Sequence, residues 1–113
     1  MKRKVEIIFL PEALKFKEKL DLKANIKLQS ILMRIAEKND VKFFKKLTSD
    51  IWELRMRYKG QQYRFFAFWD LRNERKALIL LTHGIVKKTQ KIPIKEIKRA
   101  IAIRNQYFKE NKS

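Results

Sequence analysis

The middle of the chain alternates apolar and polar residues with a period of two, which is typical of a half-buried β-strand. In the run Ile51–Tyr58, one set of alternate positions is apolar (Trp52, Leu54, Met56, Tyr58) and the other is charged (Glu53, Arg55, Arg57). We therefore expect a strand that turns its apolar side chains to the core and its charged side chains to the opposite face.

Two further strand-like runs follow the first. Tyr63–Trp69 is mostly aromatic, and Ala77–Thr82 is continuously apolar, as in a central strand that is covered on both sides. The polar segments Lys59–Gln62 and Asp70–Arg75 separate the three runs, and Gly60 can take the positive φ of a tight hairpin. The pattern predicts a three-stranded antiparallel meander that runs into a basic loop from His83.

The arginines of the first two runs are predicted to project from the same side of the sheet. Arg64 can pair with Arg55 or with Arg57, and these two registers keep the same facing because they differ by two residues. A slip by one residue would bury the arginines, and an unpaired buried charge is costly. We therefore expect Arg55 and Arg64 on the open face.

Helical patterns surround the meander. The expected order is a strand at Lys4–Phe9, a short helix from Pro11, a helix at Leu22–Lys38, a connector at Val41–Asp50, the meander, and a last helix from about Ile94 to Phe108. The fold class is α+β in one domain, residues 1–113, with a two-helix hairpin on one face of an antiparallel sheet and a C-terminal helix.

Composition adds a strong positive charge. Lys and Arg number 29 against 12 acids, for a net charge of +17, which favours a polyanionic partner such as nucleic acid. A lysine-rich surface without function is the alternative, and an anionic membrane surface is a weaker one. The chain has no cysteine and one histidine, His83, which excludes thiolate and histidine-rich metal sites. No apolar run is long enough for a membrane span or a signal peptide, so we expect a cytoplasmic protein.

The residues favour metal-free chemistry on RNA. The acids are scattered, so no metal cofactor is expected. RNA carries its own nucleophile, the 2′-OH, and Arg55 and Arg64 are candidates to clamp the phosphate. The competing interpretation is that these arginines pair with Glu53 or Asp50.

The end of the third run supplies the other catalytic candidates. Lys87 and Lys88 would reach the same site, and a lysine whose pKa is lowered by neighbouring cations can act as a general base. The alternative is a solvated basic loop. His83 has the pKa of an acid–base group, although a single histidine at a strand end is more often structural. Further RNA contacts are expected from Arg57, Lys59, Tyr63 and Lys91; Tyr63, like Tyr58, would otherwise cap the edge of the core.

Several short segments together resemble a known family. They are Glu53–Leu54–Arg55, Tyr63–Arg64 followed by aromatic residues, Leu80 to Gly84, Lys87–Lys88–Thr89 with Lys91, and Pro93 with Glu96–Ile97. Their order and spacing are similar to the HigB branch of the RelE/ParE toxin superfamily, which includes phage-derived proteins. The resemblance implies a RelE-like fold.

The resemblance also implies a function. It implies the toxin of a type II toxin–antitoxin system, a ribosome-dependent mRNA endoribonuclease (an mRNA interferase), with Arg55, Arg64, Lys87 and Lys88 as the catalytic or RNA-contacting set. It implies a helix-turn-helix antitoxin, the ribosome and mRNA as partners. ParE-like members of the superfamily inhibit DNA gyrase on the same fold, so the fold alone does not decide the activity. A non-catalytic basic RNA-binding protein is the third alternative.

Overall fold

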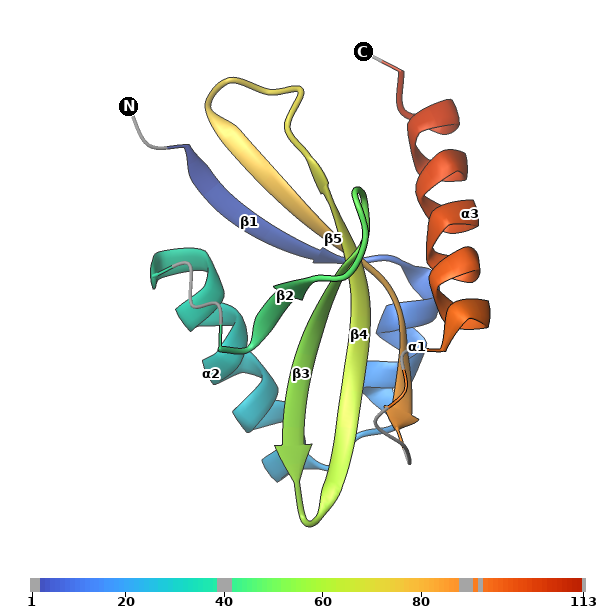
Figure 1. Ribbon diagram of the computed structural model, residues 1–113. Helices are drawn as coiled ribbons and strands as arrows, with labels where there is room; N and C mark the ends of the chain where they lie inside the picture. The colour runs from blue at the N-terminus through green and yellow to red at the C-terminus, as the bar shows by residue number, and fades with distance from the viewer. Residues whose placement is uncertain (1–2, 39–41, 88–90, 92, 113) are drawn as a thin grey trace.

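A computed structural model describes residues 3–38, 42–87, 91 and 93–112. Its elements are, in order, β1 (Lys4–Phe9), α1 (Pro11–Glu18), α2 (Leu22–Lys38), β2 (Phe44–Lys46), β3 (Trp52–Tyr58), β4 (Gln61–Asp70), β5 (Lys76–Lys87) and α3 (Ile94–Glu110) (Figure 1). The α+β fold class predicted from the sequence is confirmed. No helix in the described part of the chain is both long and apolar enough to cross a membrane.

The five strands form one sheet in the order β1-β5-β4-β3-β2. The predicted meander is present: β3 pairs antiparallel with β4, and β4 pairs antiparallel with β5. β1 pairs parallel with β5, so the sheet is mixed where the sequence predicted a wholly antiparallel one. The hydrophobic pattern cannot predict this direction, because it indicates which residues of β1 face the core and not which strand lies beside β1 or how that strand runs.

Helices cover both faces of the sheet. On one face, α1 and α2 pack Ala13, Leu28 and Ile31 against a cluster that includes Leu54 and Phe65. On the other face, α3 packs Ala100 against Phe66, Phe68 and Leu80. In Figure 1, α2 and α3 lie on opposite sides of the sheet. α3 covers part of its face, and the charged positions of β3 lie on the remaining part.

The hairpin between β3 and β4 has the predicted turn. Lys59 has a φ of 50° and Gly60 a φ of 75°, the pair of positive values that a two-residue hairpin loop of type I′ requires. This turn sets the register in which Arg55 pairs with Arg64. Of the two registers compatible with the sequence, the structure has this one.

Two elements differ from the sequence expectation. The connector contains the short strand β2, which pairs with β3 at Trp52, Glu53 and Leu54. β5 continues through the predicted basic loop to Lys87. A bulge at Thr82 of β5, opposite Phe66 and Ala67 of β4, shifts the register, so the alternation restarts in the second half of β5 and is hard to see in the sequence.

Gly84 lies within β5 for a steric reason. A Cβ atom at this position would lie 2.5 Å from the ring of Phe16, so the glycine permits close packing of α1 on the strand. The glycine therefore marks a close approach between elements, whereas the sequence pattern suggested the start of a loop.

Candidate functional site

Three cations from neighbouring strands lie on the face that α3 partly covers. Arg55 of β3 and Arg64 of β4 are register partners. Lys87 of β5 is the partner of Gln62, two residues from Arg64 on the same face of β4. We call Glu53, Arg55, Arg64 and Lys87 the cationic cluster. The sheet brings these four residues together although they span 35 positions of the chain.

Glu53 lies at the centre of the cationic cluster. Its carboxylate is completely buried and accepts a hydrogen bond from each arginine: Arg55 Nε donates to Oε1 at 2.6 Å, and Arg64 NH1 donates to Oε2 at 2.5 Å. One carboxylate thus fixes the orientation of two guanidinium groups on adjacent strands. The competing interpretation of the sequence, that the arginines pair with Glu53, is correct. Asp50 instead forms an ion pair with Arg104 of α3, in which Oδ1 of Asp50 lies 3.6 Å from NH2 of Arg104.

The expectation of two exposed arginines is correct for Arg55 and wrong for Arg64. The side chain of Arg55 is 38% exposed, whereas that of Arg64 is 2% exposed. Burial of Arg64 is tolerated because Glu53 supplies an opposite charge at hydrogen-bond distance. The Nε atom of Arg64 is buried and has no hydrogen-bond partner among the described residues. Arg55 is therefore the arginine of the cluster that is accessible from solvent.

Lys87 is also largely buried within the cluster. Burial lowers the pKa of its ammonium group from the ordinary value, the positive charges of Arg64 and Arg55 lower it further, and the charge of Glu53 partly opposes this shift. A lowered pKa increases the neutral fraction of the amine at physiological pH. The neutral amine can accept a proton, as a general base must.

His83 lies deep in the same face and is engaged on both sides of its ring. Its ring stacks on Phe66 with centroids 5.0 Å apart, Nδ1 lies 2.9 Å from Thr82 Oγ1, and Nε2 lies 3.2 Å from Glu96 Oε1. Burial lowers its pKa, and the charge of Arg99 adds to this effect, while Glu96 opposes it. These contacts join β5 to the first turn of α3 and fit the structural interpretation of this residue.

The predicted RNA-contacting residues lie at different places. Arg57 is exposed on the face of the cluster, and Lys59 lies in the hairpin turn with Nζ 5.5 Å from the centroid of the Tyr58 ring. Lys91 is exposed. Tyr63 faces the side of the sheet that α1 and α2 cover. Its ring packs there against Phe16 with centroids 6.3 Å apart, as expected of a residue at the edge of the core. Lys88, a predicted catalytic residue, lies outside the described residues.

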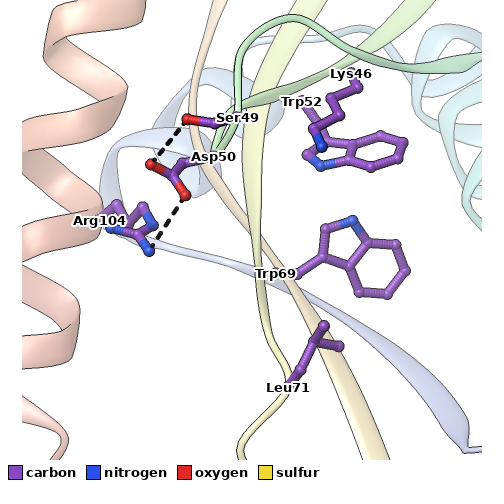
Figure 2. A pocket seen from close by; sticks show the side chains of 7 residues that line it. All are labelled: Lys46, Ser49, Asp50, Trp52, Trp69, Leu71 and Arg104. Carbon is purple, nitrogen blue, oxygen red and sulfur yellow. Dashed lines mark hydrogen bonds and ion pairs between the residues drawn. The ribbon is translucent and has the colours of Figure 1, made fainter.

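A hollow lies at the start of β3, next to Trp52 and near Arg104 of α3 (Figure 2). It has a volume of about 510 Å³ and is lined by Lys46, Ser49, Asp50, Trp52, Trp69, Leu71 and Arg104. The carboxylate of Asp50 accepts a hydrogen bond from Ser49 and forms an ion pair with Arg104, as the dashed lines in Figure 2 show. None of the predicted site residues that the structure describes lines this hollow, so we place the candidate site at the cationic cluster.

Comparison with known structures identifies the fold. A mutant of the E. coli toxin RelE in the free state matches with a TM-score of 0.57 and 19% identity, over 87% of this chain and 94% of that chain. The isolated E. coli RelE toxin matches with a TM-score of 0.50 and 19% identity, over 82% and 95% of the two chains. At this identity the likeness shows the fold, and the predicted RelE-like fold is confirmed.

The sequence family follows from a separate comparison. The family model described as "Phage derived protein Gp49-like (DUF891)" matches residues 15–105. Since this match covers most of the chain, the protein belongs to the Gp49-like family of phage-derived proteins, and the predicted family resemblance is confirmed. No curated protein matches this chain.

Proposed function

We propose that this protein is the toxin of a type II toxin–antitoxin system and acts as an endoribonuclease on mRNA that is being translated by the ribosome. The observation that carries the proposal is the cationic cluster, in which three strands place Arg55, Arg64 and Lys87 around one buried carboxylate. Membership of the Gp49-like family and the RelE fold support it.

The reaction uses the nucleophile that RNA itself provides. The 2′-oxygen attacks the adjacent phosphorus, its proton passes to neutral Lys87 Nζ, and the bond from phosphorus to the 5′-oxygen breaks. The leaving oxygen takes a proton from solvent. The products are a 2′,3′-cyclic phosphate and a 5′-hydroxyl, so no external nucleophile is needed.

The arginines stabilise the charge that grows on the phosphate. Arg55 is the exposed member and contacts the phosphate oxygens directly. Arg64 lies behind it, buried on Glu53, and contributes positive potential in a site where water is largely excluded. Because the guanidinium groups are held before the substrate arrives, little reorganisation is required during the reaction. A donor of this kind contributes about 3 kcal/mol to the stabilisation of a transition state.

The partners of the proposed toxin follow from the same reasoning. The ribosome would present the mRNA in an extended, accessible form and supply part of the positioning. A helix-turn-helix antitoxin would neutralise the protein in the cell. The net charge of +17 suits both an RNA substrate and an acidic protein inhibitor.

The test is induced expression in a bacterium, with primer-extension mapping of a translated mRNA. We expect the wild type to stop growth and to cut the mRNA in phase with its codons. We expect Arg55→Gln to cut at least about 10²-fold more slowly, since it removes a donor from the phosphate. Arg75→Gln, which removes an exposed arginine from the segment between β4 and β5, is the matched control and should behave as wild type.

The same experiment distinguishes the other functions. Growth arrest with intact mRNA and DNA damage would replace the proposal with a ParE-like gyrase inhibitor. If the folded wild-type protein causes neither growth arrest nor mRNA cleavage, a non-catalytic basic RNA-binding protein remains as the interpretation. Equal cleavage by wild type and Arg55→Gln would remove Arg55 from the active site.

A further inference from the structure

We propose that a hollow at the outer edge of β3 binds the single-stranded RNA next to the cleaved phosphate, and that Lys27 and Lys42 contact the RNA backbone there. This subsite rests on the proposed function, because it extends the cationic cluster along the path of the RNA. It adds residues of α2 and of the segment before β2, which the sequence pattern did not connect with the site.

The hollow exists because β2 is short. Among the described residues, β2 pairs with β3 at Trp52, Glu53 and Leu54, and Arg55 N donates to Phe43 O at 2.8 Å. Beyond this point α2 takes the place of a neighbouring strand: Lys27 Nζ donates a hydrogen bond to the backbone oxygen of Arg57. A hollow of about 270 Å³ lies between these elements, and Arg55 and Arg64 are among the residues that line it.

The lining of this hollow is strongly positive. Its charged residues are Lys27, Lys42, Arg55, Arg57 and Arg64, and no acidic residue of the described part of the chain lines it. Lys27 and Lys42 are exposed at the mouth of the hollow. Lys27 is held by a carbonyl oxygen, which carries no net charge, so its positive charge is not neutralised by that contact. Such an arrangement attracts a chain of phosphates more strongly than a single anion.

Aromatic residues accompany these cations. Lys42 Nζ lies 5.6 Å from the centroid of the Phe43 ring, and the guanidinium carbon of Arg34 lies 5.8 Å from it. Phe43 thus holds two cations near the hollow through cation–π interactions. Tyr63, whose ring lies on the face that α1 and α2 cover, also lines the hollow. Cations with aromatic rings beside them are the usual composition of a groove for single-stranded nucleic acid.

The hollow continues directly into the cationic cluster. Arg55 and Arg64 belong to both, because the hollow opens at the edge of the strand whose face carries the cluster. An RNA strand whose scissile phosphate lies on Arg55 therefore passes Arg57 and reaches Lys27 and Lys42 with its flanking phosphates. Lys42, which lies just before β2, thereby becomes part of the substrate path.

The experiment measures binding rather than cleavage. The probe is a fluorescently labelled single-stranded RNA with 2′-O-methyl nucleotides throughout, which this chemistry cannot cut because no free 2′-OH remains, and its affinity is measured between 50 and 200 mM salt. Each phosphate contact on a single strand contributes about 0.7 to the slope of log affinity against log salt. The variant Lys27→Gln/Lys42→Gln should therefore lower the slope by about 1.4. Over this fourfold range of salt, the wild type should lose about sevenfold more affinity than the variant.

A matched control separates the subsite from the total charge. Lys109→Gln/Lys112→Gln removes the same charge from exposed positions at and beyond the C-terminal end of α3 and should keep the wild-type slope. Equal slopes for the wild type and the Lys27/Lys42 variant would overturn the subsite, and an equal fall in both double variants would show a response to net charge only. Because the probe is not cleaved, an inactive wild type that still shows the selective fall would contradict the proposed function and keep the subsite.

Discussion

At the level of single residues, one buried carboxylate holds the cationic cluster together. Glu53 binds Arg64 in the interior and Arg55 at the surface, so the two arginines have different energetic roles. Removal of one partner from a buried ion pair leaves an uncompensated charge, whereas an exposed pair contributes little. The two arginines should therefore respond differently to the same substitution.

We expect Arg64→Ala to lower the free energy of unfolding by about 3–5 kcal/mol, because Glu53 would lose its buried partner. Arg55→Ala should lower it by no more than about 1 kcal/mol. Urea unfolding followed by circular dichroism measures both. Similar losses for the two variants would show that the burial of Arg64 has no special energetic weight. This difference also makes Arg55 the better position for functional tests.

A second residue-scale prediction concerns the ionisation of Lys87. The negative charge of Glu53 raises the pKa of Lys87 and opposes the effect of burial and of the arginines. Glu53→Gln keeps the size of the side chain and removes this charge, so the pKa of Lys87 should fall further. NMR titration of the Lys87 side chain measures the shift. In cleavage assays, the rise in activity that accompanies deprotonation of Lys87 should occur at a lower pH in Glu53→Gln than in the wild type. An unchanged or higher pKa of Lys87 in Glu53→Gln would contradict an electrostatic effect of Glu53 on Lys87.

At the scale of elements, α3 is attached to the sheet at both ends. Glu96 in its first turn meets His83 of β5. Near its other end, Tyr107 donates a hydrogen bond to Asp70 at 2.8 Å, and Arg72 binds the same carboxylate at 2.8 Å. These contacts hold the pKa of Asp70 at about 2, mainly through the hydrogen bond from Arg72.

The lowered pKa of Asp70 predicts a dependence of stability on pH. The carboxylate is ionised in the folded protein down to a pH of about 2, while in the unfolded chain it takes up a proton near its ordinary pKa of 3.8. Its contribution is therefore complete above a pH of about 4 and disappears as the pH falls to about 2. The wild type should lose about 2 kcal/mol over this range relative to Asp70→Asn. Denaturant titrations at both pH values test this, and parallel losses in the two proteins would contradict it.

The sequence predicted those elements whose pattern is local. Alternation in Ile51–Tyr58 placed Arg55 on the correct face, and Gly60 marked the turn that sets the register. The burial of Arg64 was not predictable, because it results from Glu53 of β3 and from neighbours on β5 that are distant in sequence. β2 has only three residues and no visible period, and the bulge at Thr82 interrupts the alternation in the second half of β5. Lys27 lies on a helix, so its contact with Arg57 has no signal in the sequence.

At the scale of the whole molecule, the charge and the fold act together. The net charge of +17 attracts any polyanion, and this property alone specifies neither RNA nor a reaction. The RelE fold places cations of three adjacent strands on the face that α3 partly covers, with Arg55 exposed and Arg64 and Lys87 buried. The edge of β3 extends this positive surface toward α2. We infer that general attraction brings RNA to the protein and that the cationic cluster selects the phosphate to be cleaved.

We propose that the cationic cluster cleaves RNA through the 2′-OH of the substrate. The most direct measurement uses purified protein and programmed ribosomes that carry an mRNA with either a ribose or a 2′-deoxyribose at the cut site. We expect the wild type to cut only the ribose form and to leave a 2′,3′-cyclic phosphate. Lys87→Met, which removes the base and leaves a similar shape, should cut about 10²–10⁴ times more slowly. Cleavage of the deoxy substrate, or full activity of folded Lys87→Met, would contradict the account.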